Sequence, residues 1–170
     1  MSSANRAAVV VAAIGAAAAL SFPIRLSAAP LTIAVADFDY IDTSGEVRDQ
    51  RAEHQARMAQ FAELLRAKLA AEGEFHVIPL ACAEPPCTPI NMQPEKFIAA
   101  SRRTAARFVV YGGIHKTSTL VQWGDVELLD LEANKLLLKR TVTFRGDNDE
   151  AFRRAAAFVG DTIKDAMEKR

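Results

Sequence analysis

The sequence predicts an α/β fold in which helices pack on a mixed five-stranded sheet. Segments 31–38 and 108–114 are apolar without strict alternation, which is typical of strands buried on both faces. Segments 121–131 and 136–145 read as an antiparallel pair joined by a turn. In the segments between and after these strands, apolar residues recur at helical spacing. With a short strand at 75–80, the predicted element order is β-α-β-α-β-β-β-α. Right-handed crossovers then give the strand order 2-1-3-4-5 in a three-layer-like arrangement.

In the first half of the chain, strand 31–38 is followed by a polar loop that holds Asp39 and Asp42. Helix 53–72 is predicted from apolar residues at helical spacing, with Gly73 as its terminator and His54 at its exposed start. The apolar residues are Met58, Phe61, Ala62, Leu65 and Leu69. A short strand, 75–80, follows, and its proline suits a sheet edge.

In the second half, Pro94 opens a helix that is predicted to reach Arg107. Asn134 tolerates the left-handed backbone of the turn at 132–135. The last strand is predicted to be half exposed, with Leu136, Leu138, Val142 and Phe144 sharing a face with Arg140. Asp147 is predicted to cap the final helix, with Glu150 completing a capping box. That helix buries Phe152, Ala155, Ala156, Val159, Ile163 and Met167.

Residues 1–29 have the pattern of a secretory signal peptide. Arg6 precedes the apolar run 7–20, and small residues follow at 27–29. The run is shorter than the roughly 20 residues of a spanning helix. Pro30 at the first mature position hinders cleavage, so the alternatives are cleavage at a nearby position and an uncleaved amino-terminal anchor. Residues 30–170 are predicted to form a single α/β domain in the periplasm.

The charge balance excludes several partners. The chain has 21 basic and 21 acidic residues, and removal of Arg6 and Arg25 leaves 19 basic residues. A mature chain with net charge −2 lacks the basic surface that nucleic acid or an anionic membrane requires. It also lacks an apolar run of membrane length, so the mature domain is not expected to insert in a membrane.

The two cysteines, Cys82 and Cys87, predict a disulfide in an oxidising compartment. Residues 83–86 favour a bend that brings them together. Free thiols, or a metal or redox pair, are the alternatives, although zinc needs two further ligands. The small ring is expected to add little to global stability.

No catalytic signature is present, and neither a metal nor a cofactor is predicted. The pair Gly112-Gly113 lies within a strand instead of a phosphate-binding loop. His54, His76 and His115 lack metal-ligand spacing, and the acids of 37–49 do not match a calcium loop. The sequence therefore indicates a protein that is not an enzyme.

Several segments resemble known envelope proteins. Segments 33–38, 73–77 and 105–113 resemble the small α/β domain at the amino terminus of the periplasmic TolB family, whose plan recurs in CsgG-type secretion lipoproteins. Segments 113–123 and 145–147 resemble a secreted proteobacterial family known only as a domain of unknown function. The resemblance implies the fold and the envelope compartment but supplies no activity. The chain lacks the β-propeller of TolB and the pore-forming insertions of CsgG.

The predicted topology brings chemically active side chains to one edge of the sheet. The first, third and fifth strands run the same way, so their carboxyl ends meet where open α/β sheets place ligand crevices. The predicted binding residues at this edge are Asp37, Asp39, His115, Lys116, Gln122, Trp123, Arg145 and Asp147. Trp123 and Arg145 are of the types that anchor protein interfaces. The alternatives are an Asp37–Arg145 ion pair that ties loops together and a Trp123 buried in the core.

These observations predict an exported, non-enzymatic module that binds or assembles proteins of the bacterial cell envelope. Its partner is expected to be a periplasmic or envelope protein, including a periplasmic enzyme or transport system to which it is an accessory. The alternative function is a periplasmic small-molecule sensor or an enzyme that uses the crevice at the strand ends.

Overall fold

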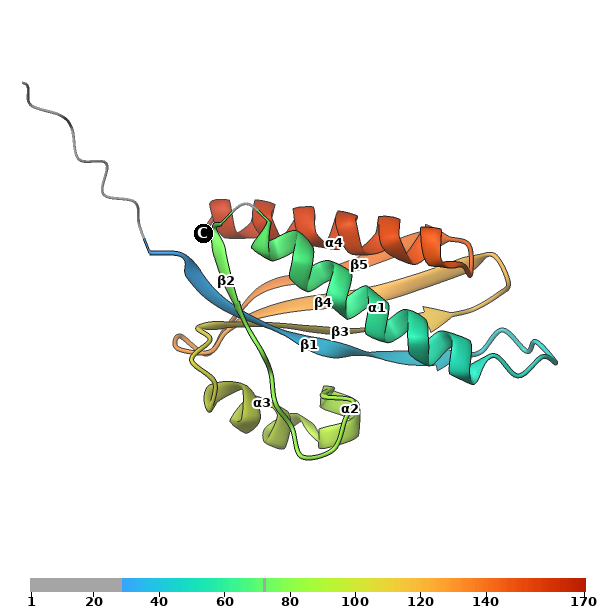
Figure 1. Ribbon diagram of the computed structural model, residues 1–170, viewed down its shortest axis with the longest axis horizontal. Coiled ribbons are helices and arrows are strands. Elements are labelled where there is room, and N and C mark those ends of the chain that lie inside the picture. The colour runs from blue at the N-terminus through green and yellow to red at the C-terminus, as the bar shows by residue number, and fades with distance from the viewer. Residues whose placement is uncertain (1–28, 72) are drawn as a thin grey trace, which may run out of the picture.

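The computed structural model describes residues 29–71 and 73–170 and confirms the predicted fold class and strand order. The predicted signal peptide, residues 1–29, lies outside the described residues except for Ala29. The elements are β1 (Leu31–Asp42), α1 (Arg51–Ala70), β2 (Phe75–Ile78), α2 (Pro89–Met92), α3 (Pro94–Arg102), β3 (Phe108–Lys116), β4 (Val121–Asp130), β5 (Lys135–Arg145) and α4 (Asp149–Glu168) (Figure 1). Within the described ranges, no helix has both the length and the apolar character of a membrane span.

The sheet has the order β2-β1-β3-β4-β5. β1 pairs in parallel with β2 and β3, whereas β4 is antiparallel to both β3 and β5. Ile33, Ala34, Val35 and Ala36 are completely buried because helices cover both faces of β1. This double burial explains the absence of alternation in the sequence.

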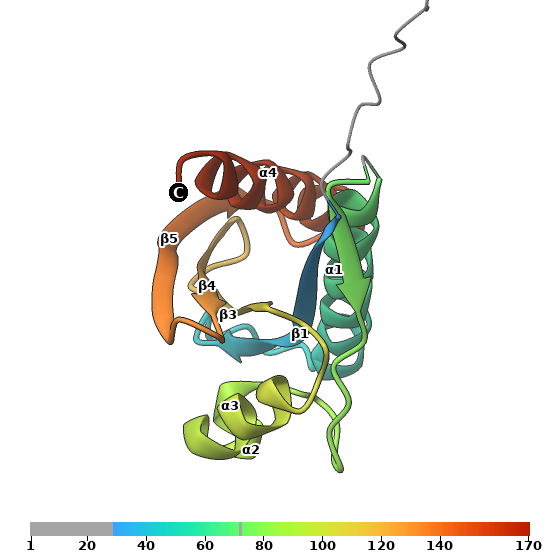
Figure 2. The same ribbon diagram turned by 90° about the vertical axis from the view of Figure 1, so that its left-hand side faces the viewer.

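Helices lie on both faces of the sheet. α1 and α4 cover the face that carries the larger core, here called the α1–α4 face. α2 and α3 lie on the opposite side of the sheet from α4, on the α3 face, where a smaller core surrounds Phe97 (Figure 2). The two cores stabilise the sheet from both sides, but α3 is too short to cover its face completely.

Two predicted boundaries were wrong. β1 continues to Asp42 because it pairs with β3 as far as Lys116, so Asp39 and Asp42 lie in a strand. α3 ends at Arg102 instead of Arg107, where Thr104 Oγ1 donates to the carbonyl of Ser101 at 2.7 Å. Such a local side-chain bond competes with continuation of the helix.

The positions of two side chains also correct the predictions. Asp147 does not cap α4, because Asn148 Oδ1 accepts the N–H of Ala151 at 2.9 Å. Leu136 is 44% exposed, since an irregularity in the β4–β5 pairing shifts it off the core face and leaves Leu137 packed against the core. By contrast, Asn134 has the predicted left-handed backbone, with φ of 51°.

Candidate functional site

The eight residues predicted for the site do not form one cluster. Side chains alternate between the two faces of a strand, so neighbouring residues at the strand ends diverge. Lys116 and Gln122 lie on the α1–α4 face with Asp147, whereas His115, Trp123 and Arg145 lie on the α3 face with Asp39. Asp37 lies beside a bulge of β1, apart from both groups.

Lys116 is the centre of a buried charge cluster on the α1–α4 face. Its side chain is fully buried, and Nζ lies 2.6 Å from Asp147 Oδ2, Glu46 Oε2 and Gln50 Oε1. Asp42 Oδ2 lies 3.8 Å away. We call these five residues the Lys116 cluster. A buried ammonium that lies among carboxylates is stable only when its hydrogen bonds are made, as they are here.

α1 completes the surroundings of Asp147. His54 Nε2 lies 3.0 Å from Asp147 Oδ2, and Arg57 Nη1 lies 2.7 Å from Oδ1. His54 is only 4% exposed and its ring contacts that of Tyr40 at a centroid distance of 4.4 Å, so the predicted exposed position of His54 was wrong. Asp147 therefore ties the beginning of α4 to α1 and β3.

The charge states of the cluster follow from its hydrogen bonds. Burial raises the pKa of Asp147, but hydrogen bonds from Lys116 and His54 outweigh it, and the pKa lies below its usual value. Burial lowers the pKa of Lys116, but hydrogen bonds to Asp147 and Glu46 outweigh it and raise the pKa. The cluster lies between the ends of β1 and β3, where the reversal of chain direction had predicted a crevice.

Acid is expected to weaken this part of the fold. Because the folded pKa of Asp147 lies below its ordinary value of 3.8, its stabilising effect is complete above that value and is lost as the pH falls through the folded pKa. Urea unfolding between about pH 5 and pH 2 measures the loss. The Asp147→Asn variant should be less stable than the wild-type protein at pH 5, but it should lose less of its free energy of unfolding on acidification than the wild-type protein does. An identical pH dependence in both proteins contradicts this assignment.

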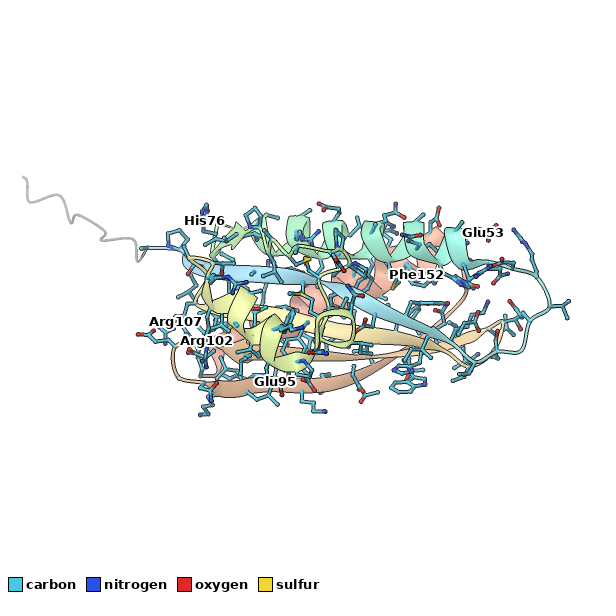
Figure 3. The ribbon with its side chains drawn as sticks, turned by 90° about the horizontal axis from the view of Figure 1, so that it is seen from below. Glu53, His76, Glu95, Arg102, Arg107 and Phe152 are labelled. Carbon is cyan, nitrogen blue, oxygen red and sulfur yellow. A yellow bond between two sulfur atoms is a disulfide. The ribbon has the colours of Figure 1, made fainter. Side chains whose placement is uncertain are left out.

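On the α3 face, a row of four side chains crosses the strand ends. Ile41 aligns with His115, His115 with Trp123, and Trp123 with Thr143. The rings of His115 and Trp123 are stacked, with centroids 4.0 Å apart and planes 3° apart. We call these four residues the open sheet face, because α2 and α3 lie over another part of the sheet, away from the end where Glu53 lies (Figure 3).

Trp123 belongs to neither apolar core and is half-buried. Its alternative role as a core residue was therefore wrong. The alternative ion pair between Asp37 and Arg145 was also wrong, because Asp37 contacts Arg66 at 3.2 Å. Arg145 is exposed at the end of β5. The open sheet face thus combines a flat aromatic stack with charged neighbours on the same side of the sheet, namely Arg145 toward the strand ends and Asp39 and Asp125 in the adjacent row.

A cleft of about 910 Å³ lies along β1, and Asp42, Glu46 and Gln50 of the Lys116 cluster line part of it. It is bounded by the first half of α1, the loop between β1 and α1, and the segment that carries the disulfide of Cys82 and Cys87. Asp37 Oδ2 accepts the N–H of Cys87 at 2.8 Å, which fixes this segment against β1. The sequence pattern did not predict the cleft, although Pro79 signals the early end of β2 that leaves the cleft open.

The described ranges contain no group of three or more His, Cys, Asp or Glu side chains arranged to hold a metal ion. The donors that do gather, in the Lys116 cluster, already surround an ammonium group. The strand ends therefore present two different structures, a buried ionic cluster and an open aromatic surface.

The family model of DUF3280, described as "Protein of unknown function (DUF2380)", matches residues 31–163. No curated protein matches the chain by sequence. The match to DUF3280 agrees with the predicted resemblance to a family of unknown function.

Several solved structures are similar. Protein XCC0632 from Xanthomonas campestris, of family-model DUF330, is 11% identical with a TM-score of 0.51, and the match covers 82% of this chain and 87% of that one. TolB from Acinetobacter baumannii is 19% identical with a TM-score of 0.48; the match covers 81% of this chain and only 28% of TolB. The PelC dodecamer from Paraburkholderia phytofirmans is 18% identical with a TM-score of 0.48, over 78% and 83%. At these identities the likeness concerns the fold alone, and the resemblance to CsgG stays a prediction.

Proposed function

Because this chain belongs to the DUF3280 family of proteins of unknown function, we propose its function from its own surface: it is a protein-binding module of the bacterial cell envelope. The observation that carries the proposal is the stacked, half-buried pair of His115 and Trp123 on a part of the sheet without a helix. A partner protein docks on the open sheet face.

The chemistry of this surface favours a protein over other ligands. Tryptophan and arginine are the residues most enriched among the few that supply most of the binding energy of an interface. Trp123 gives a flat apolar area, and the exposed Arg145 and Thr143 give polar contacts around it. This pattern of an apolar centre with a polar rim suits a protein partner of moderate affinity.

The envelope compartment is supported by two features of the chain. Residues 1–29 have the composition of a signal peptide, and Cys82 and Cys87 form a disulfide. Disulfides persist in the periplasm and are rare in the bacterial cytosol. We therefore expect an exported protein whose partner is a periplasmic or envelope protein.

The Trp123→Ala variant tests the proposal. Affinity-tagged wild-type protein is expected to capture a partner from a periplasmic extract, and the variant to bind that partner about thirtyfold more weakly. Because Trp123 is outside both cores, the melting temperature should shift by only a few degrees. Binding is measured by titration of the identified partner.

Phe158→Ala is the matched control, since Phe158 is a 52% exposed aromatic residue of α4 on the other side of the sheet. It should leave partner affinity unchanged. Two results contradict the proposal: undiminished binding by Trp123→Ala, or a reproducible thermal shift with a small molecule in the absence of any protein partner. The second result would favour the sensor or enzyme that the sequence left as the alternative.

A further inference from the structure

β1 has an open edge over its second half. β2 pairs with β1 only from Leu31 to Ala34, whereas β3 stays paired with β1 as far as Asp42. Arg66 closes the first part of this edge, because Nη2 donates to the carbonyl of Val35 at 2.9 Å. From Phe38 onward, no strand among the described residues lies on that side of β1.

The backbone of this edge points into the cleft. The N–H of Thr43 donates to the carbonyl of Lys116 at 2.8 Å, which directs Thr43 toward β3. Successive residues of a strand direct their backbone groups to opposite sides. The N–H and carbonyl groups of Phe38, Tyr40 and Asp42 therefore face the cleft, where they are available to a further strand of about five residues.

Apolar side chains line the two walls of the cleft. Met58 and Ala59 of α1 form one wall, and Pro86 and Ile90 form the other. Ile90 is 68% exposed, and Val47 at the end of the cleft is fully exposed. Side chains of an added strand would alternate between these walls and cover the uncovered apolar surface.

The cleft is negatively charged overall. Five carboxylates line it, and four of them already have a cation: Asp37 pairs with Arg66, Asp42 and Glu46 share Lys116, and Asp49 pairs with Arg51. Arg48 pairs with Glu53, so the excess negative charge comes from Asp39, which has no ion pair among the described residues, and from the sharing of Lys116 by two carboxylates. The carboxylates belong to Asp37, Asp39, Asp42, Glu46 and Asp49. Burial raises the pKa of Asp39 despite hydrogen bonds from Thr88 and Ile90, and a cationic neighbour would stabilise its ionised form. Charge complementarity therefore favours a basic ligand.

We propose that the cleft binds an extended segment of a partner protein, with alternating apolar and basic residues, as a strand added to the open edge of β1. This is a second binding surface that is separate from the open sheet face and does not depend on it. The backbone hydrogen bonds supply affinity, the apolar side chains of the segment pack on the α1 wall, and the basic side chains between them point to the opposite wall, where the Asp39 carboxylate lies beside Ile90.

A labelled octapeptide of alternating valine and lysine tests the proposal by fluorescence anisotropy with the full chain. Two altered peptides separate the contributions: one carries N-methyl groups on alternate amides, and in the other glutamate replaces lysine. Each is expected to bind at least about tenfold more weakly. Equal binding of the N-methylated peptide, equal binding of the glutamate peptide, or no binding of the original peptide at about 1 mM overturns the proposal.

Two exposed alanines of α1 give matched variants. Ala59 lines the cleft and Ala56 does not, so Ala59→Trp should reduce peptide affinity at least about tenfold, whereas Ala56→Trp should leave it unchanged. Equal affinities of the two variants also overturn the proposal. Trp123→Ala should bind the peptide normally, so that failure of this inference and failure of the proposed function give different results.

Discussion

Replacement of Lys116 by methionine is expected to lower the free energy of unfolding by about 3–5 kcal/mol. Lys116 is fully buried, and its ammonium group lies 2.6 Å from carboxylates of Asp147 and Glu46. Methionine is of similar length but leaves Glu46 without a cation and leaves Asp147 with only Arg57 and His54 as partners. Urea denaturation at neutral pH measures the loss.

Lys139→Met is the matched control, because Lys139 pairs with one glutamate as an exposed side chain, whereas Lys116 is fully buried. Its unfolding midpoint should change little. The double variant Lys116→Met with Glu46→Gln should recover part of the stability lost by Lys116→Met, since it removes the carboxylate that Lys116→Met leaves without a cation. Equal stabilities of the two lysine variants would show that the Lys116 cluster does not hold the strand ends together.

Gly112→Ala is expected to be the second strongly destabilising change, with a loss of about 3 kcal/mol or more. A Cβ atom at Gly112 would lie 2.1 Å from the carbonyl oxygen of Asp125 and 2.9 Å from the ring of Phe38. Because the first contact is with backbone, β3 and β4 would have to separate. The measurement is again urea denaturation.

The adjacent Gly113 provides the control for this variant. A Cβ atom there would meet Asp39 Cβ at 3.3 Å, a contact that a small shift relieves. Gly113→Ala should therefore cost much less stability, and equal losses would contradict the explanation. The close approach of β4 therefore explains why position 112 is a glycine. The sequence had shown only that the Gly112-Gly113 pair does not belong to a phosphate-binding loop.

Much of the fold could be predicted from the sequence because its signals are local. Continuous runs of apolar residues predicted the two central strands, β1 and β3, and apolar residues at helical spacing predicted α1 and α4. The role of Asp147 could not be predicted in this way. Its position before a helix is typical of a cap, but its partner Lys116 is 31 residues away, and the neighbouring Asn148 is equally suited to cap.

The sequence predicted that the candidate residues lie at one edge of the sheet. It did not predict that they divide between the two faces of the sheet. His115 and Lys116 are adjacent in sequence, yet strand alternation places them on opposite faces, one in the aromatic stack and the other in the ionic cluster. This alternation was available from the sequence and would have separated the two groups. The cleft beside β1 depends instead on how far β2 pairs, and sequence patterns rarely fix the end of a strand.

Photo-crosslinking in living cells tests whether the open sheet face binds an envelope protein. A photoreactive phenylalanine analogue replaces Thr143, an exposed residue aligned with Trp123, and in a second protein it replaces Gln60, an exposed residue of α1. We expect an adduct with an envelope protein from position 143, its loss when Trp123→Ala is added, and no such adduct from position 60. The absence of an adduct at position 143, or the same adduct from both positions, would contradict binding at the open sheet face.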